Sequence, residues 1–317
     1  MTFRPKTFEE YIGQNHIKDS LNISIQASRI RNKTFPHILL HGGSGLGKTT
    51  LAQIIGNELN AKIHTILATD ITSVSEVTKI FKDCKDGDII FIDEIHVLPK
   101  SFQESMYHVL EDNVFYQRKL NTLTYVMTMV EVQLPKFTCI GATTEIGKLS
   151  TPFRERFGQI FSLENYNVDE ISEIILKSAE SHEISINRNA LTNISSRCRL
   201  NPRVANRLLD RCIDYMVVHS DDPVLTENYV DDMLEMLQID NLGLTNFDRK
   251  ILEIIFTKFG GGPVGIKPLA SAVDIDEDAM IEMYEPLLTQ LEFIEKTSRG
   301  RVITQKGVNH IGYKVSA

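Results

Sequence analysis

A glycine-rich octapeptide is the part of this sequence with the clearest chemistry. Residues 42–49 read Gly-Gly-Ser-Gly-Leu-Gly-Lys-Thr, between an apolar run that ends at His41 and a segment with helical spacing. Glycines allow successive backbone N–H groups to face one anion, and the following helix adds its positive N-terminal end. The pattern predicts a P-loop in which Lys48 contacts the β and γ phosphates of a nucleotide and Thr49 binds Mg²⁺. The residues expected to hold the nucleotide here are Gly42, Gly45, Gly47, Lys48, Thr49 and Thr50.

Two carboxylates follow an apolar run further along the chain. Residues 89–92 are Ile-Ile-Phe-Ile, and Asp93 and Glu94 come directly after them. In P-loop enzymes one such carboxylate holds the Mg²⁺ ion and the other positions the attacking water. We therefore expect Asp93 to act on Mg²⁺ and Glu94 to orient or deprotonate water. Acidic residues at a strand end are common by themselves, so this prediction depends on the P-loop.

Hydroxyl and guanidinium groups extend the predicted site. Thr144 ends another apolar run and is a candidate sensor of the γ-phosphate, with a simple strand-end turn as the alternative interpretation. Arg154 and Arg156 precede the last predicted strand. An arginine that reaches the γ-phosphate of a neighbouring subunit would neutralise transition-state charge and make hydrolysis depend on assembly. A surface salt bridge is the alternative for these arginines.

Two further groups of arginines have spacing that suggests phosphate contact. Arg203, Arg207 and Arg211 recur every four residues after a proline, so they share one helix face that could cover a nucleotide. Near the C-terminus, Arg299 and Arg301 flank a glycine at a tight turn that suits contact with a nucleic-acid backbone. Binding there is expected to depend on salt and little on base sequence. The alternative is a basic turn that docks protein.

Composition limits the classes of function. A length of 317 residues predicts two or three domains. No run approaches the roughly 18 apolar residues of a membrane span, and the N-terminus has no signal-peptide pattern, so we expect a cytoplasmic protein. The net charge of −8 argues against a protein that coats nucleic acid with its whole surface, although five basic and two acidic residues follow Leu287. The four cysteines lie far apart, and reduced thiols are expected.

The elements change character along the chain. Strand-like runs alternate with helical segments in the first half, which predicts a parallel α/β sheet, and residues 113–135 have the alternation of an inserted antiparallel hairpin. The region after Tyr166 is helical, and the C-terminal region has three helices and a hairpin, as in a winged helix. The predicted strands are 37–41, 62–66, 88–92, 137–141 and 159–163. The predicted domains are 1–166, 167–240 and 241–317.

Several phrases in this order resemble the RuvB family of AAA+ ATPases, the motors that drive branch migration of Holliday junctions. The phrases are Arg4-Pro-Lys, Tyr11-Ile-Gly-Gln14, Gly45-Leu-Gly-Lys-Thr-Thr50, Phe91-Ile-Asp-Glu-Ile-His96, Gly141-Ala-Thr-Thr144, Arg156-Phe-Gly158, Asn206-Arg-Leu-Leu209, Phe259-Gly-Gly-Gly-Pro-Val-Gly265 and Arg299-Gly-Arg301. The resemblance covers nearly the whole chain. It implies an AAA+ P-loop domain, a helical lid and a C-terminal winged helix, assembled as a homo-hexameric ring on double-stranded DNA. It also implies ATP and Mg²⁺ as cofactors, and a role in recombination and DNA repair.

The resemblance also assigns roles that the residues alone do not. It implies that Arg156 is a trans-acting arginine finger with Arg154 beside it, and that Arg203 is a second sensor. It places Phe3, Arg4 and Tyr166 on the adenine side, and it makes the 113–135 hairpin the contact for the junction-binding partner RuvA. The chain departs from the family at three points. Gly43-Ser44 replaces two prolines, Val97 replaces a basic residue, and the hairpin tip has a different and slightly longer sequence. A diverged RuvA-like partner is therefore expected.

Two other functions fit part of this pattern. A clamp-loader-like AAA+ ATPase would share Lys48, Asp93 and the arginines but would not need a C-terminal wing. A non-catalytic DNA-binding scaffold would use ATP only to hold a ring together. Glu94 separates the scaffold from an enzyme, because only hydrolysis needs a residue that positions water.

Overall fold

The computed structural model describes residues 3–71, 81, 83–120 and 127–312 and contains two compact units. One unit is Arg4–Asn165, and the other runs from Tyr166 onward and includes Phe3. The tip of the predicted hairpin (121–126) and Lys314 lie outside the described residues. In the part of the chain that the structure describes, no helix is both long and apolar enough to cross a membrane.

The first unit is built on a five-stranded parallel sheet with the order β2-β3-β6-β1-β7. The strands are β1 (Ile38–His41), β2 (Ile63–Leu67), β3 (Ile89–Asp93), β6 (Thr138–Thr143) and β7 (Gln159–Ser162). The apolar runs of β1, β3 and β6 are buried almost throughout, as expected for central parallel strands. The parallel α/β sheet predicted from the sequence is confirmed, with boundaries shifted by one or two residues. Because all five strands are parallel, their carboxyl ends meet at one edge of the sheet.

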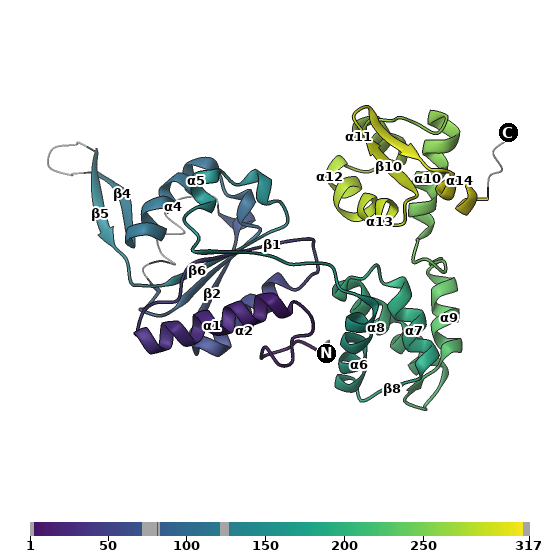
Figure 1. The fold of residues 1–317 in the computed structure, drawn as a ribbon, viewed down its shortest axis with the longest axis horizontal. Coiled ribbons are helices and arrows are strands. Elements are labelled where there is room, and N and C mark those ends of the chain that lie inside the picture. Colours follow the sequence, from purple (N-terminus) through teal and green to yellow (C-terminus); the bar gives the residue numbers. More distant parts are fainter. Residues whose placement is uncertain (1–2, 72–80, 82, 121–126, 313–317) are drawn as a thin grey trace. The chain divides into compact units, whose positions relative to one another are not determined.

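Helices cover both faces of this sheet. Figure 1 shows α1 (Asn15–Arg31) and α2 (Lys48–Leu59) along one face, with α4 (Lys100–Asp112) and α5 (Thr151–Arg154) on the other. The α4 face is closed by an apolar cluster in which Phe102 and Met106 pack with Ile90 and Ile92 of β3. Short 3-10 turns follow the strands at η1 (Ala68–Asp70), η2 (Ile95–Val97) and η3 (Ile146–Lys148). Strand β3, which ends at Asp93, therefore belongs to a sheet that is covered by helices on both faces.

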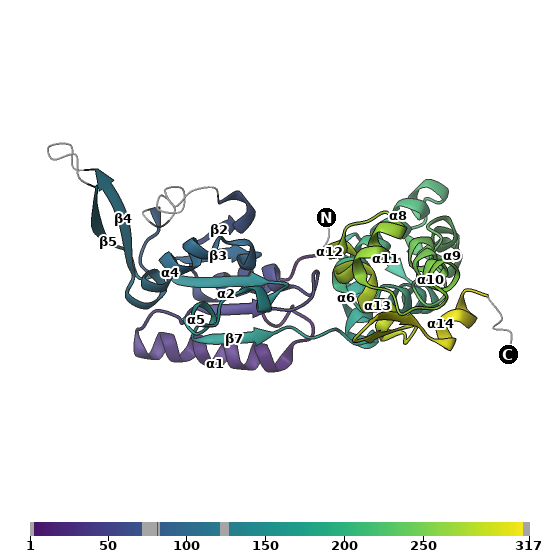
Figure 2. The same ribbon diagram turned by 90° about the horizontal axis from the view of Figure 1, so that it is seen from above.

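An antiparallel hairpin is inserted between α4 and β6. Strand β4 (Val114–Leu120) pairs with β5 (Met127–Gln133), with Val114 opposite Gln133. The two strands form a sheet of their own that extends away from the parallel sheet (Figure 2). Asn113, with a φ of 54°, ends α4 and turns the chain directly into β4. The predicted hairpin is confirmed for its described residues.

The second unit begins with a helical region. Its helices are α6 (Val168–Ser181), α7 (Arg188–Arg197), α8 (Pro202–His219) and α9 (Glu227–Met236). Asn167, Asn187 and Asn201 start the first three of these helices, and each side-chain oxygen accepts a backbone N–H of the first turn. A short parallel pair, β8 (Ser185–Ile186) and β9 (Val224–Leu225), was not predicted. We call residues 167–240 the lid.

A winged helix follows the lid. Its elements are α10 (Asn246–Phe259), α11 (Ile266–Val273), α12 (Glu277–Ala279), a π-helical turn η4 (Met280–Tyr284), α13 (Glu285–Gln290), β10 (Ile294–Thr297), β11 (Gly300–Ile303) and α14 (Gln305–His310). Strands β10 and β11 form the wing, with Thr297 opposite Gly300. Gly300 has a φ of 135°, and a Cβ there would lie 2.3 Å from the carbonyl oxygen of Val264, so the turn needs glycine. The short final helix α14 was not predicted.

Candidate nucleotide site and nucleic-acid interface

The P-loop lies between the carboxyl end of β1 and the start of α2. Gly42, Gly45 and Gly47 all have positive φ, and Gly47 is the residue that caps α2. A Cβ at Gly47 would lie 2.5 Å from the Tyr11 hydroxyl, and one at Gly42 would lie 2.8 Å from the carbonyl oxygen of Leu163. Glycine is therefore required at both ends of the loop by close packing as well as by backbone angle.

Lys48 points into the loop that precedes it. Its Nζ donates to the carbonyl oxygens of Gly42 (2.8 Å) and Gly43 (3.0 Å), and the residue is buried. Burial, together with the nearby charge of Lys48, lowers the pKa of His41 below its usual value. His41 is thus favoured as a neutral side chain, and Lys48 supplies the positive charge inside the loop.

Thr49 and Asp93 meet where α2 faces the end of β3. The Thr49 hydroxyl donates to Oδ2 of Asp93 at 3.1 Å, and the backbone N–H of Glu94 donates to Oδ1 of Asp93 at the same distance. A hydroxyl and a carboxylate are the hard oxygen ligands that Mg²⁺ prefers. The residue pair predicted as metal ligands is therefore brought together, and its donor set fits Mg²⁺.

Glu94 and Thr144 are directly hydrogen-bonded. Oε2 of Glu94 accepts from the backbone N–H of Thr144 (3.1 Å) and from its hydroxyl (3.2 Å). Glu94 has a φ of 47°, an uncommon backbone angle for a residue with a side chain and one that is often found at functional sites. Two residues predicted from separate segments thus form one contact at the carboxyl edge of the sheet.

His96 belongs to the same group and was not given a role from the sequence. Its Nδ1 lies 3.0 Å from the Thr143 hydroxyl and 3.3 Å from Oε2 of Glu94, while its Nε2 lies 3.3 Å from Oε1 of Glu145. Lys148 in turn contacts Glu145. The short turn η2 brings His96 back beside the Glu94 carboxylate. A histidine two residues after the glutamate was the only sign of this contact in the sequence.

The predicted adenine-side residues are divided between the two units. Arg4 is exposed and belongs to the P-loop unit, where Gln14 bonds both the N–H and the carbonyl of Glu164. Phe3, Tyr166 and Arg203 belong to the second unit. Tyr166 is buried there, while Arg203, Arg207 and Arg211 are exposed along one face of α8. The helix begins at Pro202, as predicted.

Arg154 and Arg156 lie at the end of α5. Arg154 donates to the Thr151 hydroxyl at 3.1 Å. Arg156 donates to the carbonyl oxygen of Pro152 (3.2 Å), pairs with Glu111 (3.2 Å) and lies over the Tyr107 ring (5.0 Å to its centroid). Within one chain, Arg156 is therefore engaged in an ion pair, which was the alternative interpretation of this residue.

The structure separates the two wing arginines. Arg301 forms a two-point ion pair with Glu285 (2.6 and 3.3 Å), and Lys296 binds the same carboxylate at 3.0 Å. Burial alone would raise the pKa of Glu285, but hydrogen bonds from Arg301 and Lys296 outweigh it and hold the pKa below its usual value. Arg299 is exposed, and its guanidinium has no partner among the described residues. Among the described residues Arg301 is therefore paired inside the domain, whereas Arg299 is not, and contact of the two arginines with nucleic acid stays a prediction.

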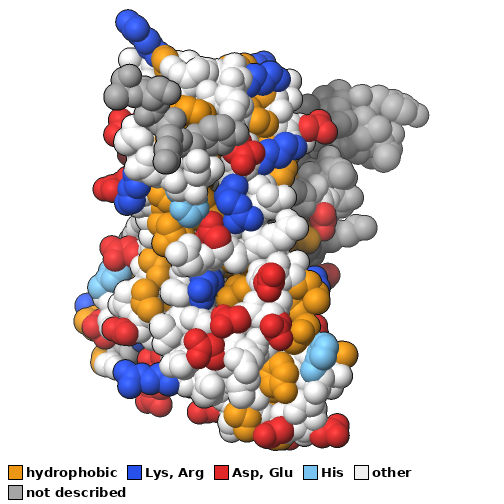
Figure 3. Space-filling view, turned by 90° about the vertical axis from the view of Figure 1, so that its right-hand side faces the viewer, with side chains coloured by type: hydrophobic (Ala, Val, Ile, Leu, Met, Phe, Trp, Pro, Cys, Tyr) orange, Lys and Arg blue, Asp and Glu red, His pale blue; other side chains and the backbone are white. Residues whose placement is uncertain are grey.

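The surface charge of the second unit is uneven. Residues 166–240 contain 14 acidic and 7 basic residues. On the face drawn in Figure 3, acidic side chains gather over the lid in the lower half, and basic side chains lie mainly over the winged helix above. A narrow basic wing on an acidic unit agrees with a local contact to a nucleic-acid backbone rather than a broad one.

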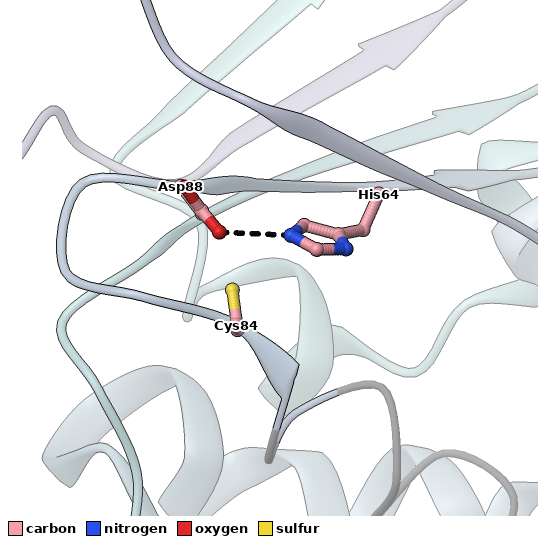
Figure 4. Close-up of side chains that lie close together, drawn as sticks. All are labelled: His64, Cys84 and Asp88. Carbon is pink, nitrogen blue, oxygen red and sulfur yellow. Dashed lines mark hydrogen bonds and ion pairs between the residues drawn. The ribbon is translucent and has the colours of Figure 1, made fainter.

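A second cluster of polar side chains lies at the opposite edge of the parallel sheet. Nε2 of His64 donates to the Asp88 carboxylate at 2.8 Å, and the sulfur of Cys84 lies within 4.8 Å of both groups (Figure 4). Asp88 also accepts the backbone N–H of Lys85, and burial with the Asp88 charge raises the pKa of Cys84 to about 11. The thiol is thus protonated at neutral pH, and the cluster is hydrogen-bonded within itself. We assign a structural role to this cluster, which stabilises the turn before β3. All four cysteines of the chain are free and buried.

The sheet order, the P-loop and the group of Asp93, Glu94 and Thr144 define a P-loop ATPase of the AAA+ class. Three family models match consecutive parts of the chain: the Holliday junction DNA helicase RuvB P-loop domain over 3–163, the RuvB AAA lid domain over 166–240, and the RuvB C-terminal winged helix domain over 241–312. The chain belongs to the RuvB family.

Similar proteins agree with this assignment. The chain is 41% identical over 312 residues to the Holliday junction branch migration complex subunit RuvB of Fervidobacterium nodosum, covering 98% of this chain and 89% of that one. It is 40% identical to the same subunit of Streptococcus uberis, covering 98% and 92%. The solved structure of the Thermotoga maritima RuvB Holliday junction branch migration motor superposes with a TM-score of 0.88 at 38% identity, covering 99% of both chains.

Proposed function

We propose that this chain is the ATP-driven DNA motor of a Holliday junction branch migration complex. One observation carries the proposal: this member of the RuvB family joins Glu94 to Thr144 by two hydrogen bonds at the carboxyl edge of the sheet and also has a winged helix that exposes Arg299. A clamp-loader-like ATPase has no need of the wing, and a scaffold has no need of Glu94. Of the three functions, only a DNA motor needs both Glu94 and the winged helix.

The proposed roles at the nucleotide combine the contacts within the P-loop unit with the roles that the family resemblance implies. Lys48 and the P-loop amides bind the β and γ phosphates of ATP, and Thr49 and Asp93 hold Mg²⁺, which neutralises phosphate charge when bound. Glu94 positions the attacking water, and Thr144 senses the γ-phosphate and fixes the Glu94 carboxylate. Phe3, Arg4 and Tyr166 lie on the adenine side, with Arg203 as the second sensor. We propose domain boundaries of 1–166, 167–240 and 241–317 for these parts.

Assembly is proposed to complete the site. Arg156, with Arg154 beside it, reaches the ATP of the next subunit in a homo-hexameric ring, as the family resemblance implies. Neutralising transition-state charge from a second chain makes hydrolysis depend on the ring. Arg299 contacts the DNA backbone, so ATP-driven movement of the lid would carry the wing along duplex DNA.

The hairpin is the proposed contact for a RuvA-like partner. It leaves Tyr116, Met129 and Val130 exposed, at 41%, 61% and 38% of their full accessibility. Exposed apolar side chains on a projecting two-stranded ribbon suit docking to an apolar partner surface. This placement, together with a cytoplasmic setting, agrees with the work of a DNA recombination and repair complex.

Branch exchange on a synthetic four-way junction tests the function. We expect the purified chain, with ATP, Mg²⁺ and a RuvA-like protein, to convert the junction into two duplexes. Glu94→Gln should abolish both this exchange and ATP turnover, while nucleotide binding and rings persist. Turnover retained in Glu94→Gln would overturn the assignment of this residue. Hydrolysis without branch exchange, under any partner condition, would favour the clamp-loader-like alternative.

A further inference from the structure

Arg156 is held inside its own chain by three groups of two helices. Its guanidinium lies over the ring of Tyr107 and pairs with Glu111, both on α4, and it donates to the carbonyl of Pro152 on α5. The Nε of Arg156 is buried without a hydrogen-bond partner among the described residues. A buried donor without an acceptor is costly, so this docked position is incompletely satisfied. A phosphate oxygen would offer the guanidinium a better set of acceptors.

Helix α4 also contacts α5, the short helix that ends two residues before Arg156. The Tyr107 hydroxyl lies 3.1 Å from the Ser150 hydroxyl at the start of α5, and the Tyr107 ring packs against Phe153 with centroids 6.2 Å apart. Tyr107 therefore contacts both the guanidinium of Arg156 and the helix that precedes it.

The last turn of α4 is joined to the hairpin. His108 packs edge-on against Tyr116 of β4, with ring centroids 5.2 Å apart. The carbonyl of Asn113, which links α4 to β4, accepts the backbone N–H of Leu134 at 2.8 Å. Glu111 lies within this turn, two residues before Asn113. The hairpin and the Glu111 contact of Arg156 therefore share the last turn of α4.

We propose that Glu111 and Tyr107 are positioning residues that retain Arg156 in its own subunit, and that the hairpin controls this retention through the last turn of α4. The proposal rests on the proposed role of Arg156 as a trans-acting finger. Glu111 then competes with the phosphates of the neighbouring subunit for one guanidinium. Weakening the Glu111–Arg156 ion pair favours the release of Arg156 toward the neighbouring subunit. A partner bound to the hairpin acts on the same ion pair through the last turn of α4.

ATP turnover measured over a series of protein concentrations, with saturating ATP, Mg²⁺ and duplex DNA, tests the proposal. Glu111→Gln keeps the size of the side chain and removes the charge. We expect it to lower the protein concentration at half-maximal turnover by about two- to fivefold, the effect of one partly exposed ion pair. Tyr116→Ala, which removes the contact with His108, should shift this concentration in the same direction. A merely structural role for Glu111 would change thermal stability and leave the concentration dependence in place.

Two controls separate the outcomes. Glu104→Gln removes an exposed carboxylate from the same helix, and it should leave the concentration dependence unchanged. Arg156→Ala should abolish turnover at every concentration. If Arg156→Ala is inactive but Glu111→Gln matches the unaltered chain, retention by Glu111 is wrong and the finger assignment stands. If Arg156→Ala retains full turnover, both the finger and its retention are wrong.

Discussion

Glu94 is the residue at which the parts of the nucleotide site meet. Its carboxylate contacts Thr144, the residue directly after β6, and His96 from the turn after β3, while its backbone N–H donates to Asp93. Sequence patterns identified Asp93, Glu94 and Thr144 because each follows an apolar strand in a recognisable phrase. They gave no role to His96, because its importance depends on a turn that brings it back against the strand ends. The spacing of residues in the sequence does not show that a turn will place His96 beside the strand ends.

The contacts of His96 lead to a prediction at this scale. His96→Gln should lower ATP turnover about tenfold while changing nucleotide affinity little, because it loosens Glu94, the residue proposed to position water, and leaves the P-loop intact. Steady-state turnover and calorimetric nucleotide binding measure the two quantities separately. Val97→Ala, an exposed neighbour in the same turn, is the matched control and should behave like the unaltered chain. Full turnover in His96→Gln would show that Glu94 is held by Thr144 alone.

Among the elements, the sheet and the hairpins were the most predictable. The apolar runs of β1, β3 and β6 indicated burial on both faces, and their alternation with helical segments predicted the parallel arrangement. The pair β8 and β9 escaped prediction because two residues per strand leave no periodicity to detect. The wing was predicted, but the direction of Arg301 was not, since its partner Glu285 lies 16 residues earlier on α13.

The wing arginines should therefore behave differently when substituted. Arg299→Ala should weaken duplex binding and lower the slope of log affinity against log salt by about 0.9, the value for one phosphate contact, without loss of stability. Arg301→Ala should destabilise the winged helix by on the order of 2 kcal/mol, because Glu285 is left buried with only Lys296. Salt-dependent binding and thermal unfolding measure these effects. Equal loss of salt slope in the two variants would return Arg301 to the DNA surface.

At the scale of the whole molecule, the P-loop with the proposed hydrolysis residues and the proposed DNA contact lie in different compact units. The P-loop unit holds Lys48, Asp93 and Glu94, and the second unit holds both the lid and the wing. The family resemblance predicted these parts, but the joint between lid and winged helix could not be read from the sequence. Arg199, whose φ is 59°, forms that joint, and nothing in its neighbourhood along the chain marks it.

Breaking this joint should separate ATP hydrolysis from work on DNA. Arg199 pairs at 2.5 Å with Asp248, a fully buried residue near the start of α10, and donates to the carbonyl oxygen of Met283 at 3.1 Å. Arg199→Gln leaves the Asp248 charge uncompensated, so we expect a loss of about 3 kcal/mol in stability of the second unit. We also expect branch exchange to fall severalfold while ATP turnover is retained, because lid movement would no longer be passed to the wing. Arg197→Gln is the matched control, since Arg197 donates to Asn193 within its own helix. Junction exchange per ATP hydrolysed is the quantity to compare, and an unchanged ratio in Arg199→Gln would show that the lid and the wing are coupled by other contacts.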